Sequence, residues 1–209
     1  MKLNEQQRKT LQRVVAAYQP TVLIGTSGQG GAFDEETVRT MSNAVDTPVI
    51  LPMSNPTAIS EAEPEDLLRW TEGRALVATG SPFDDVPMRG GDQRIGQANN
   101  VFIFPGIGLG TIVSGASEVT DGMISASAQA LADSLSQKEI DERCLMPEVS
   151  QLWNVSGNVA SAVGRQAIVD GVSDNISAKV LEERIEEYRW QPEYPEMVQE
   201  GDRRRNIVE

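Results

Sequence analysis

Short apolar runs alternate with stretches of helical spacing along the first half of the chain. Three of these runs are rich in β-branched and small apolar residues and are bounded by Gly, Pro or polar residues. They cover residues 21–24, 48–53 and 75–79. Runs of this length and composition are typical of strands that are buried inside a sheet.

Helical spacing predicts three helices around these strands. The first covers residues 3–18 and is stopped by Pro20. The second follows Asp34, whose side chain can cap it. The third runs from about 64 to 71 and ends at Gly73. The order after the first helix is therefore strand, helix, strand, helix, strand.

Consecutive βαβ units of this kind predict parallel strands in one sheet, joined by right-handed crossovers. Ligands bind such sheets in the crevice at the carboxyl ends of the strands. Each predicted strand is followed by a small polar loop, at 25–28, 54–56 and 80–82. We therefore expect these loops to converge on one shared crevice.

The pattern changes after residue 84. Residues 84–98 are polar and Gly-rich and predict a loop or hairpin. Helical spacing then dominates, and Ser136 to Glu139 fits a capping box. One predicted helix ends at about Ser114, and three more cover about 121–134, 148–170 and 177–189. The polar tail, residues 190–209, is expected to be loose. The predicted fold class is α/β, an incomplete Rossmann-like parallel sheet (βαβαβ) followed by an all-helical C-terminal segment.

A Gly-rich phosphate loop normally follows the first strand of a dinucleotide-binding sheet. The stretch 28–31 has the wrong spacing for this loop, and so has the stretch 106–110. Close helix packing explains the glycines of the second stretch better than phosphate binding does. If the chain has a dinucleotide-binding fold, we expect the first half of that fold to lie upstream.

The formal net charge of −13 argues against nucleic acid and membrane surfaces as partners, because both are anionic. The acidity is explained as well by solubility or adaptation to salt. No apolar run approaches the roughly 18–20 residues of a membrane helix. The N-terminal stretch is polar and does not resemble a signal peptide, so a cytoplasmic location is expected.

Histidine is absent, and Cys144 is the single cysteine of the chain. This composition excludes the commonest general base, the commonest zinc ligand and an internal disulfide. Catalysis by this chain would need Lys, Tyr or carboxylate side chains, or residues from another source. We interpret Cys144 as a semi-buried side chain without a chemical role.

An ordered set of motifs lies along the chain: Leu23-Ile24-Gly25-Thr26-Ser27-Gly28, Ser54-Asn55-Pro56-Thr57, Ala62-Glu63-Pro64-Glu65-Asp66, Gly80-Ser81-Pro82-Phe83, Asn99-Asn100-Val101-Phe102-Ile103-Phe104-Pro105-Gly106 and Val119-Thr120-Asp121-Gly122-Met123. This set resembles the malic enzymes, which oxidise and decarboxylate malate. The match is nearly collinear from about residue 20 to residue 189. The chain thus resembles the C-terminal part of a malic enzyme, including the second half of its NAD-binding domain.

The resemblance implies NAD- or NADP-dependent conversion of L-malate to pyruvate and CO₂, with Mg²⁺ or Mn²⁺ bound by residues outside this chain. It implies that residues 1–98 are the C-terminal half of a Rossmann-like NAD(P)-binding domain. Residues 99–175 would be a helical segment against the cofactor and substrate cleft, and 176–209 a C-terminal helix and tail.

The resemblance also implies the residues of the site. Substrate would be bound by Asn55, Asn99 and Asn100. The cofactor would be bound by Gly25, Thr26, Ser27, Gly28, Ser54, Asn55, Gly80 and Ser81. An amide NH₂ can donate to a carboxylate without adding a titrating group. From their local pattern alone, Asn55 and Asn99 could equally be a turn residue and a helix-capping residue.

The family's catalytic tyrosine and lysine, its acidic metal ligands and its Gly-rich fingerprint lie upstream of the matched region. No catalytic residue or metal ligand is therefore assigned to this chain. One hypothesis is a part of a malic enzyme that binds cofactor and substrate without independent turnover. The alternative is a non-catalytic binding or assembly module that pairs with a separate malic-enzyme chain, either its N-terminal part or a full-length subunit. A homo-oligomer is also an expected assembly. A different α/β nucleotide-binding enzyme is the weakest option, because an intact phosphate loop was not found.

Overall fold

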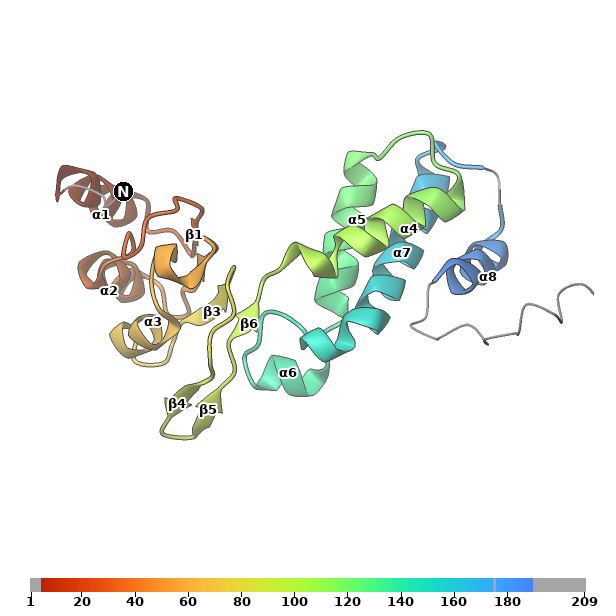
Figure 1. Cartoon of the computed structure of the whole chain (residues 1–209). Helices are drawn as coiled ribbons and strands as arrows, with labels where there is room; N and C mark the ends of the chain where they lie inside the picture. Colours follow the sequence, from red (N-terminus) through yellow and green to blue (C-terminus); the bar gives the residue numbers. More distant parts are fainter. Residues whose placement is uncertain (1–4, 175, 190–209) are drawn as a thin grey trace, which may run out of the picture.

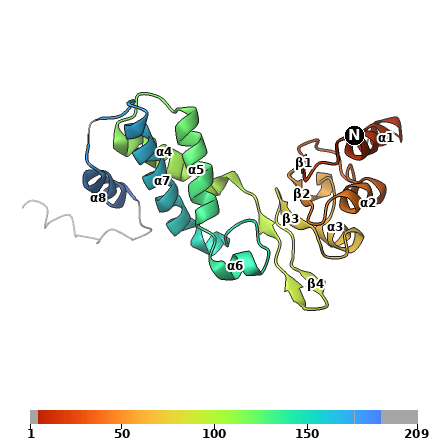
Figure 2. The same cartoon turned by 180° about the vertical axis from the view of Figure 1, so that it is seen from behind.

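The computed structural model describes residues 5–174 and 176–189, and the predicted tail at 190–209 lies outside them. Figure 1 shows two parts side by side: an α/β part built from the first half of the chain and a helical part built from the second. A hairpin and a short strand join them. The view from behind shows the same separation of the two parts (Figure 2).

The sheet of the α/β part has four parallel strands in the order β1-β2-β3-β6. The predicted strands are confirmed as β1 (Val22–Gly25), β2 (Val49–Pro52) and β3 (Leu76–Thr79). The fourth strand, β6 (Gly96–Gln97), pairs with β3 and was not predicted. Its two residues, Gly and Gln, carry no apolar signal, so only pairing with β3 defines it as a strand.

Three helices pack with this sheet around one core. They are α1 (Glu5–Tyr18), α2 (Glu35–Ala44) and α3 (Pro64–Trp70), and the short helix η1 (Thr57–Ile59) precedes α3. The core holds Met41 of α2, Ile50 of β2 and Leu67 of α3, which are fully buried. Asp34 caps α2 as predicted, since its side chain accepts a hydrogen bond from Thr37 N.

The Gly-rich segment after β3 forms a hairpin, which confirms the predicted loop or hairpin. Its strands are β4 (Val86–Met88) and β5 (Gly91–Gln93), which pair antiparallel. Figure 1 shows the hairpin projecting away from the sheet before the chain returns through β6. The hairpin therefore stands at the junction of the two parts.

The helical part is built around one long helix. Its elements are η2 (Asn100–Phe102), α4 (Phe104–Ser114), α5 (Asp121–Asp133), α6 (Gln137–Asp141), η3 (Val149–Gln151), α7 (Leu152–Val169) and α8 (Ala178–Tyr188). Helices α4, α5 and α8 all pack against α7. The predicted capping box at Ser136 is confirmed, because its side chain and that of Glu139 cap each other's backbone.

Glycines of α4 allow it to approach α7 closely, as the sequence predicted. A Cβ atom at Gly106 would lie 2.6 Å from Val159 Cβ, and one at Gly110 would lie 2.5 Å from the carbonyl oxygen of Ala160. Gly108, between them, faces open space. The backbones of the two helices therefore fit together only because side chains are missing at two positions.

Buried contacts of Arg94 join the two parts. Its guanidinium lies 3.3 Å from the carboxylate of Glu139 and donates to the carbonyl oxygen of Met146 at 2.9 Å. Burial alone would raise the pKa of Glu139, but hydrogen bonds from Ser136 and the charge of Arg94 hold it below its usual value. The buried hydrophobic residues form separate clusters on the two sides of this junction. The last residue in sequence of the first cluster is Ile95, and the first buried residue of the next is Phe102. The division at 98 and at 175 stays a prediction.

Gly110→Ala is expected to lower the free energy of unfolding by about 1–3 kcal/mol, because the new methyl group overlaps the backbone of α7. Gly108→Ala is the matched control on the same helix. It is expected to be neutral or to stabilise by up to about 1 kcal/mol, because alanine favours the helix and has room there. Urea unfolding followed by circular dichroism measures both. Equal shifts for the two variants would contradict the packing argument.

Candidate functional site

Backbone hydrogen bonds between neighbouring strands continue into the residues that follow the strands. Met53 N donates to the oxygen of Gly25 at 2.8 Å, and Gly80 N donates to that of Pro52 at 3.1 Å. On the far side of β3, Ala98 N donates to Thr79 O at 2.8 Å. The loops after all four strands therefore begin at one edge of the sheet, as expected for parallel strands.

The carboxylate of Glu61, which the sequence analysis did not single out, joins the loops after β1 and β2. Glu61 is completely buried. It accepts hydrogen bonds from Ser27 N at 2.7 Å and Ser27 Oγ at 2.8 Å, and from Ser54 Oγ at 2.5 Å and Ser54 N at 3.2 Å. Ser54 Oγ in turn accepts from Gly28 N at 2.8 Å.

Burial by itself would raise the pKa of Glu61. The hydrogen bonds from Ser54 and Ser27 outweigh burial and hold the pKa below its usual value. Glu61 is therefore a charged carboxylate, satisfied by neutral donors, at neutral pH. A motif search for catalytic residues could not find it, because its partners Ser27 and Ser54 are separated from it by 34 and 7 positions.

Two glycines at strand ends are required by packing before any ligand is considered. A Cβ at Gly25 would lie 2.6 Å from Glu61 Cδ, and one at Gly80 would lie 2.0 Å from Met53 O. A side chain at Gly25 would therefore displace the buried carboxylate. At Gly80 it would push apart the backbones that follow β2 and β3.

The side chain of Asn55 is exposed. Its Oδ1 accepts a hydrogen bond at 3.1 Å from the hydroxyl of Ser81, which is buried. The Nδ2 group of Asn55 has no partner within residues 5–174 and 176–189. Toward the described residues, both N–H donors of this amide are therefore free at the carboxyl edge of the sheet.

In Asn99, as in Asn55, the amide oxygen is hydrogen-bonded within the protein and the NH₂ group is not bonded to any described residue. Its Oδ1 accepts from Val101 N at 3.0 Å and caps η2, so the local interpretation as a capping residue is correct. Its Nδ2 lacks a partner in the part of the chain that the structure describes. Asn100 is exposed and is the first residue of η2.

The structure brings the predicted residues to one edge of the sheet. Gly25 ends β1 itself, and the loops after β1, β2, β3 and β6 carry Thr26, Ser27, Gly28, Ser54, Asn55, Gly80, Ser81 and Asn99. Asn55 and Asn99 flank the end of β3, because Ser81 contacts the first and Thr79 binds the residue before the second. Their roles toward ligands stay predictions.

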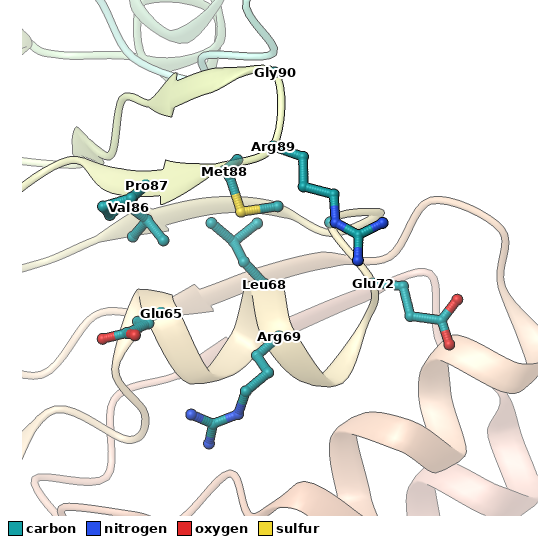
Figure 3. A pocket seen from close by; sticks show the side chains of 10 residues that line it. Glu65, Leu68, Arg69, Glu72, Val86, Pro87, Met88, Arg89 and Gly90 are labelled. Atoms are coloured by element: carbon teal, nitrogen blue, oxygen red, sulfur yellow. The ribbon is translucent and has the colours of Figure 1, made fainter.

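A cleft of about 840 Å³ lies away from these residues, between α3 and the hairpin (Figure 3). Figure 3 shows Met88 pointing toward Leu68, with Arg89 and Glu72 at one end. Predicted site residues are absent from its lining. A second cavity, of about 680 Å³, is lined by Gly28 together with parts of 30–35 and 57–63. It therefore touches the predicted site only at Gly28.

Within the described ranges, no group of three or more Asp, Glu or Cys side chains could hold a metal ion. None of the described helices is long and apolar enough to cross a membrane. Cys144 is more deeply buried than predicted, with 4% of its surface exposed. Burial raises the pKa of its thiol, which agrees with a side chain that has no chemical role.

The fold and the site define a class of protein: a Rossmann-like α/β protein whose polar loops meet at the carboxyl edge of a parallel sheet, followed by helices. A family profile described as "Malic enzyme, NAD binding domain" matches residues 1–168. The chain therefore belongs to the malic enzyme family and matches its NAD-binding domain.

Curated relatives agree with this assignment. The chain is 49% identical to the NAD-dependent malic enzyme of Sodalis glossinidius over 185 residues, which are 88% of this chain and 33% of that protein. It is 48% identical to the NAD-dependent malic enzyme of Acinetobacter baylyi, over 87% of this chain and 32% of that protein. The chain thus spans about a third of the length of these relatives.

Solved structures of malic enzymes share the fold. The Entamoeba histolytica enzyme superposes with a TM-score of 0.67 at 24% identity, covering 85% of this chain and 33% of that one. The Pyrococcus horikoshii enzyme gives a TM-score of 0.62 at 24% identity, covering 87% and 36%. The arrangement of sheet and helices is therefore found in whole enzymes as well.

Glu61→Gln is expected to lower the free energy of unfolding at neutral pH by about 1–3 kcal/mol, because four donors lose a charged acceptor. The pKa of Glu61 is lowered by folding. Its stabilisation is therefore present above the unfolded value of about 4.5 and is lost as the pH falls through the folded value. The variant should consequently lose less stability below that pH than the wild type.

Urea unfolding at a series of pH values measures this difference. Glu65→Gln, which removes an exposed carboxylate from α3, is the control and should leave the acid profile unchanged. If the free energy of unfolding of Glu61→Gln depends on pH in the same way as that of the wild type, the buried carboxylate does not stabilise the fold as described.

Proposed function

We propose that this chain supplies cofactor- and substrate-binding residues of a malic enzyme and has no independent turnover. The reaction is the NAD(P)-dependent oxidative decarboxylation of L-malate to pyruvate and CO₂. One observation carries the proposal: Asn55 and Asn99 flank the end of β3, each with its amide oxygen occupied and its NH₂ group free among the described residues.

Two fixed NH₂ groups suit a dicarboxylate such as malate. An amide donates to a carboxylate without titrating, and hydrogen bonds to charged acceptors are stronger than those to neutral ones. Ser81 orients Asn55, and the start of η2 orients Asn99, so neither amide has to be ordered when a ligand binds. We assign Asn100, exposed beside them, to the substrate as well.

The loops beside Asn55 fit a nicotinamide cofactor. When bound, NAD or NADP would accept the hydride from C2 of malate. In our proposal the residues that would hold the cofactor are those of these strand ends and loops: Gly25, Thr26, Ser27, Gly28, Ser54, Asn55, Gly80 and Ser81. Holding the two reactants about 3–3.5 Å apart is a problem of positioning, which rigid loops at strand ends solve. The names of the relatives, NAD-dependent malic enzymes, favour NAD.

The divalent metal of the reaction does not fit the described residues, because they contain no cluster of ligands. The chain also lacks histidine as a general base. The resemblance implies that the catalytic tyrosine and lysine and the metal ligands come from sequence upstream of the matched region. These three considerations support binding without turnover.

Binding of NAD⁺ and of L-malate, measured by NMR titration of the labelled chain, tests the proposal. Asn55→Ala and Asn99→Ala are each expected to weaken binding of malate in the presence of NAD⁺ by at least about tenfold, because each removes a donor to a charged group. Asn43→Ala, at an exposed position of α2, is the control. The purified wild-type chain with malate, either cofactor and Mn²⁺ should form no reduced cofactor.

Failure of the wild type to bind either ligand would refute the binding role. Clear turnover by the chain alone would refute the claim of inactivity. Equal binding by the two site variants and the Asn43→Ala control would remove Asn55 and Asn99 from the site.

A second function, assembly, is favoured by the open side of the sheet. Among the residues that the structure describes, strand β1 is at the edge of the sheet and pairs on one side only, with β2. Its outward side chains are apolar and exposed, 46% for Val22 and 60% for Ile24. An open edge beside an apolar face favours association with another chain. We propose pairing with the N-terminal part of a malic enzyme or, without it, with a second copy.

Size-exclusion chromatography with light scattering should give a mass above the 22.7 kDa of one chain. Ile24→Lys is expected to shift the chain toward the monomer, because it places a charge on the apolar face of β1. Val169→Lys changes an apolar side chain that is 77% exposed at the end of α7 and is the matched control. A wild type that is a stable monomer would argue against obligate pairing.

A further inference from the structure

Within residues 5–174 and 176–189, the charge of Glu61 has no cation to balance it. Its carboxylate is fully buried, and its partners are the neutral donors of Ser27 and Ser54. In the ranges that the structure covers, no Lys or Arg forms an ion pair with it. One negative charge therefore remains behind the loops after β1 and β2.

The same network engages four backbone N–H groups of these loops. Ser27 N and Ser54 N donate to Glu61, Gly28 N donates to Ser54 Oγ, and Gln29 N donates to Ser27 Oγ at 3.2 Å. A loop that binds phosphate does the opposite and points free N–H groups at the ligand. The N–H groups of Ser27, Gly28, Gln29 and Ser54 are thus engaged within the protein and do not form the set of free donors that a phosphate-binding loop presents.

We propose that Glu61 makes this edge of the sheet selective for the oxidised, cationic nicotinamide ring over the reduced, neutral ring. The inference rests on the proposed function, because it presumes that the cofactor binds at these loops. Glu61 would act through its charge, without touching the ligand. It is therefore a specificity-determining residue and not a catalytic one.

The surroundings of Glu61 allow its charge to act at a distance. A buried charge is screened by salt and water much less than an exposed one. Gly25 adds no side chain between the carboxylate and the end of β1, since a Cβ there would lie 2.6 Å from Glu61 Cδ. The lowered pKa of Glu61 keeps the carboxylate charged at neutral pH. The field at the edge is therefore negative under ordinary conditions.

Dissociation constants for NAD⁺ and NADH, measured separately by NMR titration of the full chain, test the proposal. The wild type is expected to bind NAD⁺ about tenfold more tightly than NADH, equivalent to about 1.4 kcal/mol. Glu61→Gln, which keeps the shape and removes the charge, should bring the ratio close to one. Glu61→Asp, which keeps the charge, and Glu139→Gln, a buried carboxylate in the helical part, should retain the preference.

The outcomes separate this inference from the proposed function. If the wild type binds neither form, the proposed function fails and the inference fails with it. Equal binding of both forms by the wild type overturns the inference alone. A preference for NAD⁺ that persists in Glu61→Gln also overturns it.

A second pair of variants covers the case in which Glu61→Gln does not fold. Ser27 is exposed, and Ser27→Lys places an ammonium group beside the carboxylate. This change should reduce the preference for NAD⁺, whereas Ser27→Gln, similar in reach but uncharged, should reduce it less. If the two variants show the same ratio of dissociation constants, charge at this position does not determine the preference and the proposal is wrong.

Discussion

The candidate site depends on the hydrogen bonds that the buried carboxylate of Glu61 accepts from Ser27 and Ser54. Taking a charge out of water costs several kcal/mol unless hydrogen bonds replace the lost hydration. Here four hydrogen bonds from Ser27 and Ser54 do so, and they hold the loops after β1 and β2 together. The buried carboxylate also restricts which residue can stand at position 25. The end of β1 approaches the carboxylate so closely that only glycine, which has no side chain, fits there.

Structural and functional interpretations of the site residues are compatible. Asn99 caps η2 with its oxygen, and Asn55 accepts from Ser81 with its own. A carboxamide has both an acceptor and two donors, so one end can fix the fold while the other remains available to a ligand. The local roles of Asn55 and Asn99 are the reason that their NH₂ groups are held in fixed directions.

Among the described residues, the sheet has an open edge at β1. The chain spans about a third of the length of its curated relatives, and the same fold occurs within whole malic enzymes. Val22 and Ile24 are exposed on β1, whereas the opposite face is covered by helices. The helical part, by contrast, has its own buried clusters around α7, and Arg94 joins it to the sheet.

The sequence by itself determined the order of strands and helices, the caps at Asp34 and Ser136, and the family, because these depend on neighbours within a few residues or on ordered motifs. Only the tertiary structure decided the rest. Strand β6 exists through its pairing with β3. Glu61 and Ser27 are 34 positions apart, and Ser81 and Asn55 are 26 apart. Such contacts leave no periodic signal in the sequence, since folding alone brings their partners together.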